Sequence, residues 1–271
     1  MICAACAATL VARFSMLYLA YLLIGLTGVS FGLIGAGGAI LIVPILVYLV
    51  GIPSEKATGY ALPISMMVSG VGSLIGAKQK QVNFLRALEF GIPVAVMTFL
   101  TRRFLTPQTP EMLFGIPKKS ALMVGFALIL FVASLSMIFG KKFVPPEKPH
   151  PAIGLLFGSV VGLLAGVFGI GGGFLIVPLL GLFFGLAMKQ AVPTSLTAVF
   201  LIVSSGFAAE FLNHSDLPWM FLGGIIAYAA TGMVIGSALR QVIDGNRLKA
   251  GFGWFVLAVG VLVLTLEFLR R

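Results

Sequence analysis

Hydrophobic residues run along the chain in long blocks that short polar stretches separate. A helix needs about 20 apolar residues to cross the hydrocarbon core of a bilayer, so blocks of this length are typical of membrane-spanning segments. Eight such blocks occur, at roughly 15–51, 59–77, 84–101, 120–139, 152–186, 193–212, 218–239 and 248–268. The pattern predicts an all-α polytopic membrane protein with about eight transmembrane segments.

The first and fifth blocks are too long for one membrane helix. Each runs for about 35 residues, or about 52 Å at 1.5 Å per residue, against a hydrocarbon core of about 30 Å. Each also carries a glycine cluster near its middle, in GAGGAILIVPIL at 35–46 and GIGGGFLIVPLL at 169–180. Both blocks are therefore expected to be two short helices joined by an irregular piece.

The two glycine clusters belong to an internal repeat. Residues 32–51 and 166–185 align without a gap and are identical at ten of twenty positions, at an offset of 134. The alignment predicts two repeats of four segments, at 15–140 and 152–271, with a lead-in at 1–14 and an interfacial linker at 141–151. Broken segments at equivalent points of two repeats are typical of transporter binding sites.

The relative orientation of the repeats depends on how the broken segments run. If each crosses the membrane once, the Lys and Arg residues divide nine against nine between the two sides. If each returns as a re-entrant hairpin, or crosses the membrane twice, the repeats are inverted and the residues divide eight against ten. Neither tally orients the chain under the positive-inside rule. Inverted repeats with re-entrant hairpins are favoured by analogy with other secondary transporters.

Composition excludes a soluble protein. Hydrophobic residues make up 59% of the chain and charged residues 10%, so there is too little polar surface to cover a globule in water. The net charge of +10 does not indicate nucleic acid, because pairs such as Arg102–Arg103 sit between apolar blocks, where loop cations meet lipid headgroups. Membrane lipids and a small solute are the expected partners.

The glycine clusters suit an anion. A helix that starts near Ala39 or Phe174 would direct its free N–H groups and the positive end of its dipole toward the break. Two such ends near the midplane predict an anion site that needs no buried Lys or Arg. The alternative is close helix packing through small residues. The candidate binding residues of the motifs are Gly35, Gly37, Gly38, Pro44, Gly169, Gly171, Gly172, Gly173 and Pro178.

Hydroxyl side chains follow the second motif. Thr194, Ser195 and Thr197 can donate hydrogen bonds to an anion, although each can also bond to a carbonyl of its own helix. Tyr60 and Ala61 occupy the positions equivalent to Thr194 and Ser195. The site is therefore expected to be asymmetric, with the more specific contacts from the second repeat.

Carboxylates are rare inside the apolar blocks. Glu89 follows Arg86 by three residues and can pair with it on one helix face, and Glu210 closes the sixth block. Structural pairing is the favoured interpretation of both. If protons are coupled to transport, Glu89 and Glu210 are the first candidates to carry them.

The duplicated element, G-x-G-G-G-x-x-x-V-P-x-L in its second copy and followed there by A-V-P-T-S-L, resembles the TauE/SafE family of sulfite and organosulfonate exporters over about residues 20–268. The resemblance implies a multi-pass permease of a bacterial-type inner membrane that moves a small sulfur-containing anion. The chain departs from the family pattern in TGYAL at 58–62 and in the extended loop at 102–119, which indicates a subfamily with a different substrate preference.

The leading hypothesis is a secondary transporter of such an anion, an exporter or permease that works by alternating access around a midplane site. A passive anion channel would use the same helix dipoles. An intramembrane enzyme is disfavoured, because G-x-S-x-G, H-E-x-x-H and paired membrane aspartates are absent from the sequence. Neither a cofactor nor a metal is expected, since the C-x-x-C of Cys3 and Cys6 has no second pair and no histidine at ligand spacing.

Overall fold

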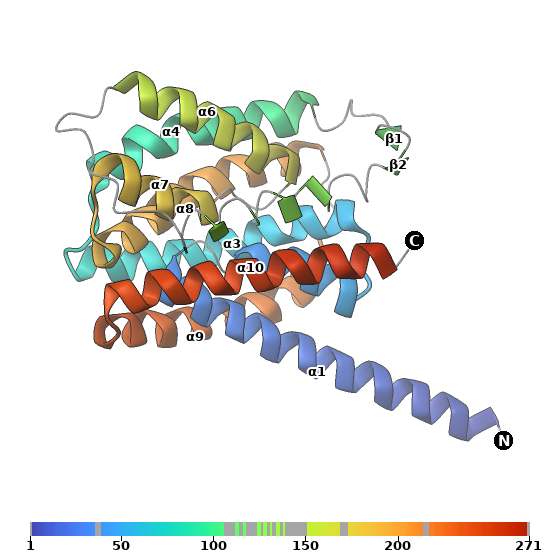
Figure 1. Ribbon diagram of the computed structural model, residues 1–271. Helices are drawn as coiled ribbons and strands as arrows, with labels where there is room; N and C mark the ends of the chain where they lie inside the picture. The colour runs from blue at the N-terminus through green and yellow to red at the C-terminus, as the bar shows by residue number, and fades with distance from the viewer. Residues whose placement is uncertain are drawn as a thin grey trace.

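The computed structural model is almost entirely helical (Figure 1). It describes residues 2–35, 39–105, 112–113, 116–117, 151–168, 173–213 and 217–269, together with eight residues between 124 and 138. The elements are α1 (Ile2–Ile34), α2 (Ala39–Pro44), the π-helix η2 (Ile45–Leu49), α3 (Ser54–Lys78), α4 (Phe84–Leu100), the π-helix η3 (Thr101–Leu105), β1 (Met112–Leu113), β2 (Ile116–Pro117), α6 (Pro151–Phe168), α7 (Gly173–Phe184), α8 (Met188–Asn213), α9 (Trp219–Val242) and α10 (Gly245–Leu269). The short antiparallel pair of β1 and β2 lies in the extended loop and is a small departure from the expected all-α fold.

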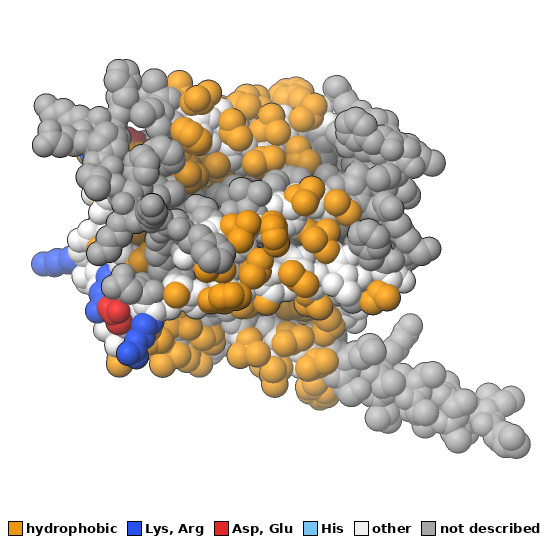
Figure 2. All heavy atoms as spheres, in the orientation of Figure 1, with side chains coloured by type: hydrophobic (Ala, Val, Ile, Leu, Met, Phe, Trp, Pro, Cys, Tyr) orange, Lys and Arg blue, Asp and Glu red, His pale blue; other side chains and the backbone are white. Residues whose placement is uncertain are grey.

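Within the described residues, four helices are long and apolar enough to cross a membrane. They are α3, α4 with its extension η3, α8 and α9. Shorter apolar stretches occur in α1, α6 and α10, at Tyr18–Ile34, Leu155–Val167 and Gly253–Thr265. Apolar side chains cover the middle of the surface, and the charged ones in view gather at one end of the helices (Figure 2). The chain is thus a helical membrane protein; most of the block expected at 120–139 lies outside the described residues.

Helices end and restart around both glycine clusters. Gly35 follows α1 with a φ of +83°, a backbone conformation that glycine adopts without strain, and α2 begins at Ala39, as expected. In the second repeat α6 ends at Phe168 and α7 begins at Gly173, one residue before the expected start. The π-helix η2 follows directly after Pro44.

The two segments that follow the glycine clusters end in the same way. Gly51 and Gly185 occupy equivalent positions of the repeat, and both have positive φ, +78° and +64°. The next residue in each case bonds back to the preceding helix, from Ile52 N to the Leu46 carbonyl at 2.9 Å and from Leu186 N to the Leu180 carbonyl at 3.4 Å. Such a bond over six residues satisfies a carbonyl that the helix end would leave free.

Glycines allow α1 to pack directly on α9. Gly28 lies against the backbone of Ala229, and Gly32 lies one turn further along against Gly236. The contacts advance in the same direction along both helices, so α1 and α9 are parallel. A side chain at either glycine of α1 would force the two backbones apart.

The same arrangement joins α6 to α4. Gly162 lies against Val94, where a Cβ would come within 2.6 Å of the carbonyl oxygen, and Gly166 lies against Thr101. These contacts also advance together, so α6 and α4 are parallel. The first helix of each repeat therefore packs on a long helix of the other repeat: α1 packs on α9, and α6 packs on α4.

α3 and α8 cross the centre of the molecule in opposite directions. Gly59 near the start of α3 lies against Glu210 near the end of α8, and Gly76 near the end of α3 lies against Pro193 near the start of α8. Since α8 and α9 also reverse direction, α1, α3 and α9 run one way and α4, α6 and α8 the other (Figure 1). The chain between α1 and α3, which includes α2 and η2, therefore leads back across the molecule.

Candidate functional site

The first glycine cluster meets the second repeat at Gly35. A Cβ at this position would lie 2.7 Å from the Ser195 hydroxyl oxygen and 3.1 Å from a methyl carbon of Val177. Ser195 is fully buried in α8, and Val177 is fully buried in α7. One contact thus brings together the break in the first repeat, the short helix after the second break and the T-S-L element.

Thr194 and Ser195 are both buried, and both already hold a hydrogen bond. The Ser195 hydroxyl donates to the Val192 carbonyl of its own helix at 2.7 Å. The Thr194 hydroxyl oxygen accepts from the backbone N–H of Asn83 at 3.0 Å, and Asn83 is the N-cap of α4. Thr194 therefore ties α8 to the loop between α3 and α4, while Ser195 faces the glycine break.

Thr197 lies on another side of α8. Its hydroxyl shares a 2.8 Å hydrogen bond with the Ser73 hydroxyl of α3 and donates to the Pro193 carbonyl at 3.1 Å. Of the three hydroxyl residues in the predicted set, Ser195 is therefore the one that touches Gly35, and Thr197 belongs to the contact between α3 and α8.

The remaining motif residues are placed as follows. Pro44 is the last residue of α2, Gly173 is the first residue of α7, and Pro178 lies within α7. Gly37, Gly38, Gly169, Gly171 and Gly172 lie outside the described residues.

The two predicted carboxylates sit in different environments. Glu89 accepts a 2.6 Å ion-pair hydrogen bond from Arg86 near the surface, which confirms the pairing expected from their spacing. Glu210 is bound at 2.6 Å by Arg102, whose side chain is only 3% exposed. The interpretation of Arg102 as a loop cation is wrong, because η3 continues α4 past its end and carries the guanidinium inward against α8.

A second buried arginine was not anticipated. Arg240, in the last turn of α9, is 2% exposed and donates from Nη2 to the side-chain oxygens of Gln79 and Gln81, at 3.2 and 3.3 Å. Its Nη1 has no hydrogen-bond partner, and no carboxylate forms an ion pair with it, among the described residues. The bundle therefore contains buried arginines, although the anion site predicted at the glycine breaks requires none. The sequence around a single arginine at the edge of an apolar block does not indicate whether its side chain is buried in the bundle or faces the lipid headgroups.

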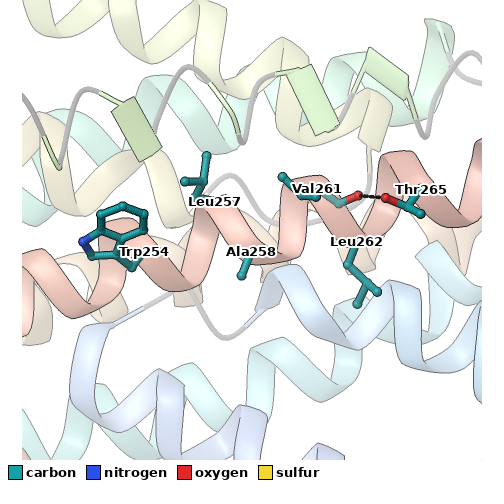
Figure 3. A pocket seen from close by; sticks show the side chains of 6 residues that line it. All are labelled: Trp254, Leu257, Ala258, Val261, Leu262 and Thr265. Atoms are coloured by element: carbon teal, nitrogen blue, oxygen red, sulfur yellow. Dashed lines mark hydrogen bonds between the residues drawn. The ribbon is translucent and has the colours of Figure 1, made fainter.

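A shallow groove along α10 is a different feature. It has a volume of about 440 Å³ and is lined by Trp254, Leu257, Ala258, Val261, Leu262 and Thr265 (Figure 3). The Thr265 hydroxyl donates to the Val261 carbonyl at 2.8 Å, so the groove offers mainly apolar surface, with the Trp254 indole N–H as a further polar group of its lining. Such a surface suits lipid chains, and the groove is not a candidate anion site.

Comparison with known proteins gives consistent matches over most of the chain. The family model described as Sulfite exporter TauE/SafE matches residues 20–263. A probable membrane transporter protein of Xylella fastidiosa (strain Temecula1) is 26% identical over 250 residues, which cover 89% of this chain and 92% of the relative. A protein of the same description from Haemophilus influenzae is 25% identical over 92% of this chain and 98% of its own length.

The similarity extends to an archaeal protein. A probable membrane transporter protein of Methanocaldococcus jannaschii is 29% identical over 74% of each chain. No solved structure matches the chain. The helical membrane fold, the paired glycine–proline motifs and the family match over nearly the whole length agree, and the chain belongs to the TauE/SafE family of membrane transporter proteins.

Proposed function

We propose that the protein is a secondary transporter that moves a small sulfur-containing anion, such as sulfite or an organosulfonate, across a bacterial-type inner membrane. The contact of Gly35 with Ser195 is the observation that carries the proposal. It joins the glycine break of the first repeat to the T-S-L element of the second at one point inside an apolar bundle, where close packing alone would not require a broken helix. The sulfur chemistry of the substrate rests on the family.

The proposed topology consists of two inverted repeats whose first segments return as hairpins. The support is the helix directions: α1 and α3 run the same way, and so do α6 and α8. In each repeat, the chain between these two parallel helices must run back in the opposite direction. This return gives each repeat an odd number of membrane crossings, so the second repeat enters the membrane from the opposite side. Transporters with this symmetry place their substrate at the interface between the repeats.

The proposed anion site lies where α2 and α7 begin. The first residues of α7 present N–H groups without a helical partner and the positive end of the helix dipole. Ser195 reinforces this site from α8, because its hydroxyl can rotate away from the Val192 carbonyl and donate to a bound anion. Alternating access then requires the two repeats to rock around this point.

Proton coupling is proposed for Glu210 before Glu89. Glu210 lies 22% exposed beside a buried arginine, whereas Glu89 is 42% exposed in a surface pair. Protonation of a carboxylate inside the bundle would alter the contact between α4 and α8, which a surface pair cannot do.

Flux measurements in proteoliposomes test the proposal. Vesicles that contain the purified protein are expected to take up labelled sulfite with saturation, and sulfate and simple sulfonates are tested as competitors, with and without a pH gradient. Uptake that rises linearly with sulfite concentration and is indifferent to competitors would indicate a passive channel. Absence of sulfur-anion flux under every gradient would refute the proposal.

A further inference from the structure

We propose that Arg240, with Gln79 and Gln81, forms a binding subsite for a small oxyanion at the end of the bundle next to Gly35. The inference rests on the proposed anion transport and identifies residues that would hold the substrate on its way to or from the glycine breaks.

The charge of Arg240 has no counter-charge among the described residues. Its side chain is 2% exposed, and its two hydrogen bonds go to neutral amide oxygens. A cation taken out of water without a counter-charge is costly, and the unpartnered Nη1 adds an unsatisfied donor to that cost. A bound anion would relieve both.

Arg102, the other buried arginine, is paired with a carboxylate, which Arg240 lacks among the described residues. Each arginine lies near the end of the third long helix of its half, Arg102 after α4 and Arg240 in α9. Arg102 is neutralised by Glu210 of α8. The repeat offset aligns Glu210 with Gly76 of α3, a position that has no side chain at all.

The surroundings of these two aligned positions correspond. Glu210 lies against Gly59, and Gly76 lies against Pro193, which is the aligned partner of Gly59. One end of the molecule therefore holds an arginine with its carboxylate, whereas at the end that holds Arg240 the position aligned with that carboxylate has no side chain. An oxyanion at Arg240 would take the role that Glu210 fills at the opposite end.

Arg240 also lies at the level of the first glycine break. α1 and α9 run parallel with Gly32 against Gly236, and one further turn leads to Gly35 on α1 and to Arg240 on α9. The loop that carries Gln79 and Gln81 continues to Asn83, whose N–H donates to Thr194, the neighbour of Ser195. The arginine, this loop and the T-S-L element form one connected group.

The donors in this group suit an oxyanion. A guanidinium presents its N–H groups in a planar fork that matches two oxygens of a sulfite, sulfonate or sulfate group. Because both glutamines turn their oxygen atoms toward Arg240, their NH₂ groups remain as further donors at the rim.

The decisive variant is Gln81→Glu, which puts a carboxylate beside Arg240 without a change in side-chain size. We expect it to fold, with an unfolding temperature at or above that of the parent, and to lose the increase in that temperature that sulfite produces in the detergent-solubilised parent protein. Arg240→Gln is expected to lose the same increase and to raise the KM for sulfite flux at least tenfold. Arg86→Gln removes a cation that is already paired with Glu89 at the same end and serves as the control that keeps both properties.

A retained sulfite-induced shift in Gln81→Glu would show that Arg240 is only structural and would overturn the proposal, even if Arg240→Gln does not fold. Flux with an unchanged KM in both variants would also overturn it while leaving the transporter intact. A shift that depends on Arg240 in a protein that moves no sulfite would support the subsite and refute the transport.

The source of the anion is tested with two vesicle compositions. If Arg240→Gln differs from the parent only in vesicles that contain phosphatidylglycerol, the bound group is a lipid headgroup and the proposal of a soluble anion is wrong. The proposal expects the same difference in vesicles of neutral phosphatidylcholine alone.

Discussion

Gly35 at the end of α1 packs so closely on Ser195 of α8 that a Cβ on the glycine would come within 2.7 Å of the serine hydroxyl oxygen. The two residues come from different repeats, and each belongs to the element that marks its repeat in the sequence. The contact leaves no room for another side chain, and any group that passes this point must displace one of the two partners.

Replacement of Gly35 by alanine is expected to abolish transport. Its φ of +83° imposes a conformational cost of about 1–2 kcal/mol on alanine, and the new methyl group would also meet Ser195. Gly51→Ala is a matched control, because Gly51 has a φ of +78° but no atom within 4 Å of its Cβ position. Sulfite flux per reconstituted molecule measures both. Equal loss in the two variants would show that backbone strain, and not the contact with Ser195, is responsible.

The bond between Thr194 and Asn83 is expected to stabilise the fold. Thr194→Val removes the acceptor of the Asn83 N–H and should lower the free energy of unfolding by about 1 kcal/mol, the typical value for such a bond. Thr194→Ser keeps the hydroxyl and should retain the stability. Thermal unfolding in detergent distinguishes them. A valine variant as stable as the serine variant would mean that water replaces the bond.

The Arg102–Glu210 ion pair is expected to contribute more to the free energy of unfolding than the bond between Thr194 and Asn83. Glu210→Gln leaves the guanidinium of Arg102 without a counter-charge, and loss of one partner of a buried pair costs up to about 3–5 kcal/mol, the lower end applying here because Glu210 is 22% exposed. The double variant Arg102→Gln with Glu210→Gln should recover part of this loss in the same unfolding assay. A Glu210→Gln variant as stable as the parent would contradict this structural contribution, and loss of the pH dependence of flux in the same variant would separately support the proposed proton role.

The inverted topology predicts which loops share a side of the membrane. Lys80, between α3 and α4, and Asp244, between α9 and α10, should lie on one side, with Lys56 at the start of α3 on the other. Single cysteines at these positions, in a Cys3→Ser, Cys6→Ser background, can be labelled in cells with a membrane-impermeant maleimide. Repeats with single-crossing broken segments would put Lys80 and Asp244 on opposite sides.

Local patterns in the sequence predict much of the fold. Block length and glycine clusters locate the helix starts at Ala39 and next to Phe174, because glycine and the length limit of a membrane helix act within a few residues. The Arg86–Glu89 pair follows from helical spacing in the same way.

Contacts between distant segments could not be predicted from the sequence. Arg102 and Glu210 lie on different helices of different repeats, and nothing near either residue indicates the other. The π-helical turn that buries Arg102 and the two glutamines that hold Arg240 depend on how α4, α8 and α9 pack. Both arginines therefore look like ordinary cations at the ends of apolar blocks until the helices are assembled.

Exchange transport tests the central claim most directly. Proteoliposomes loaded with unlabelled sulfite and diluted into a trace of labelled sulfite should accumulate the label transiently. The reason is that the binding site of an alternating-access carrier reorients across the membrane faster with sulfite bound than when it is empty. The same vesicles with Gly35→Ala should accumulate none, and those with Gly51→Ala should accumulate as much as the parent. Label that enters at the same rate whether or not the vesicles contain sulfite would contradict a carrier built around Gly35 and Ser195.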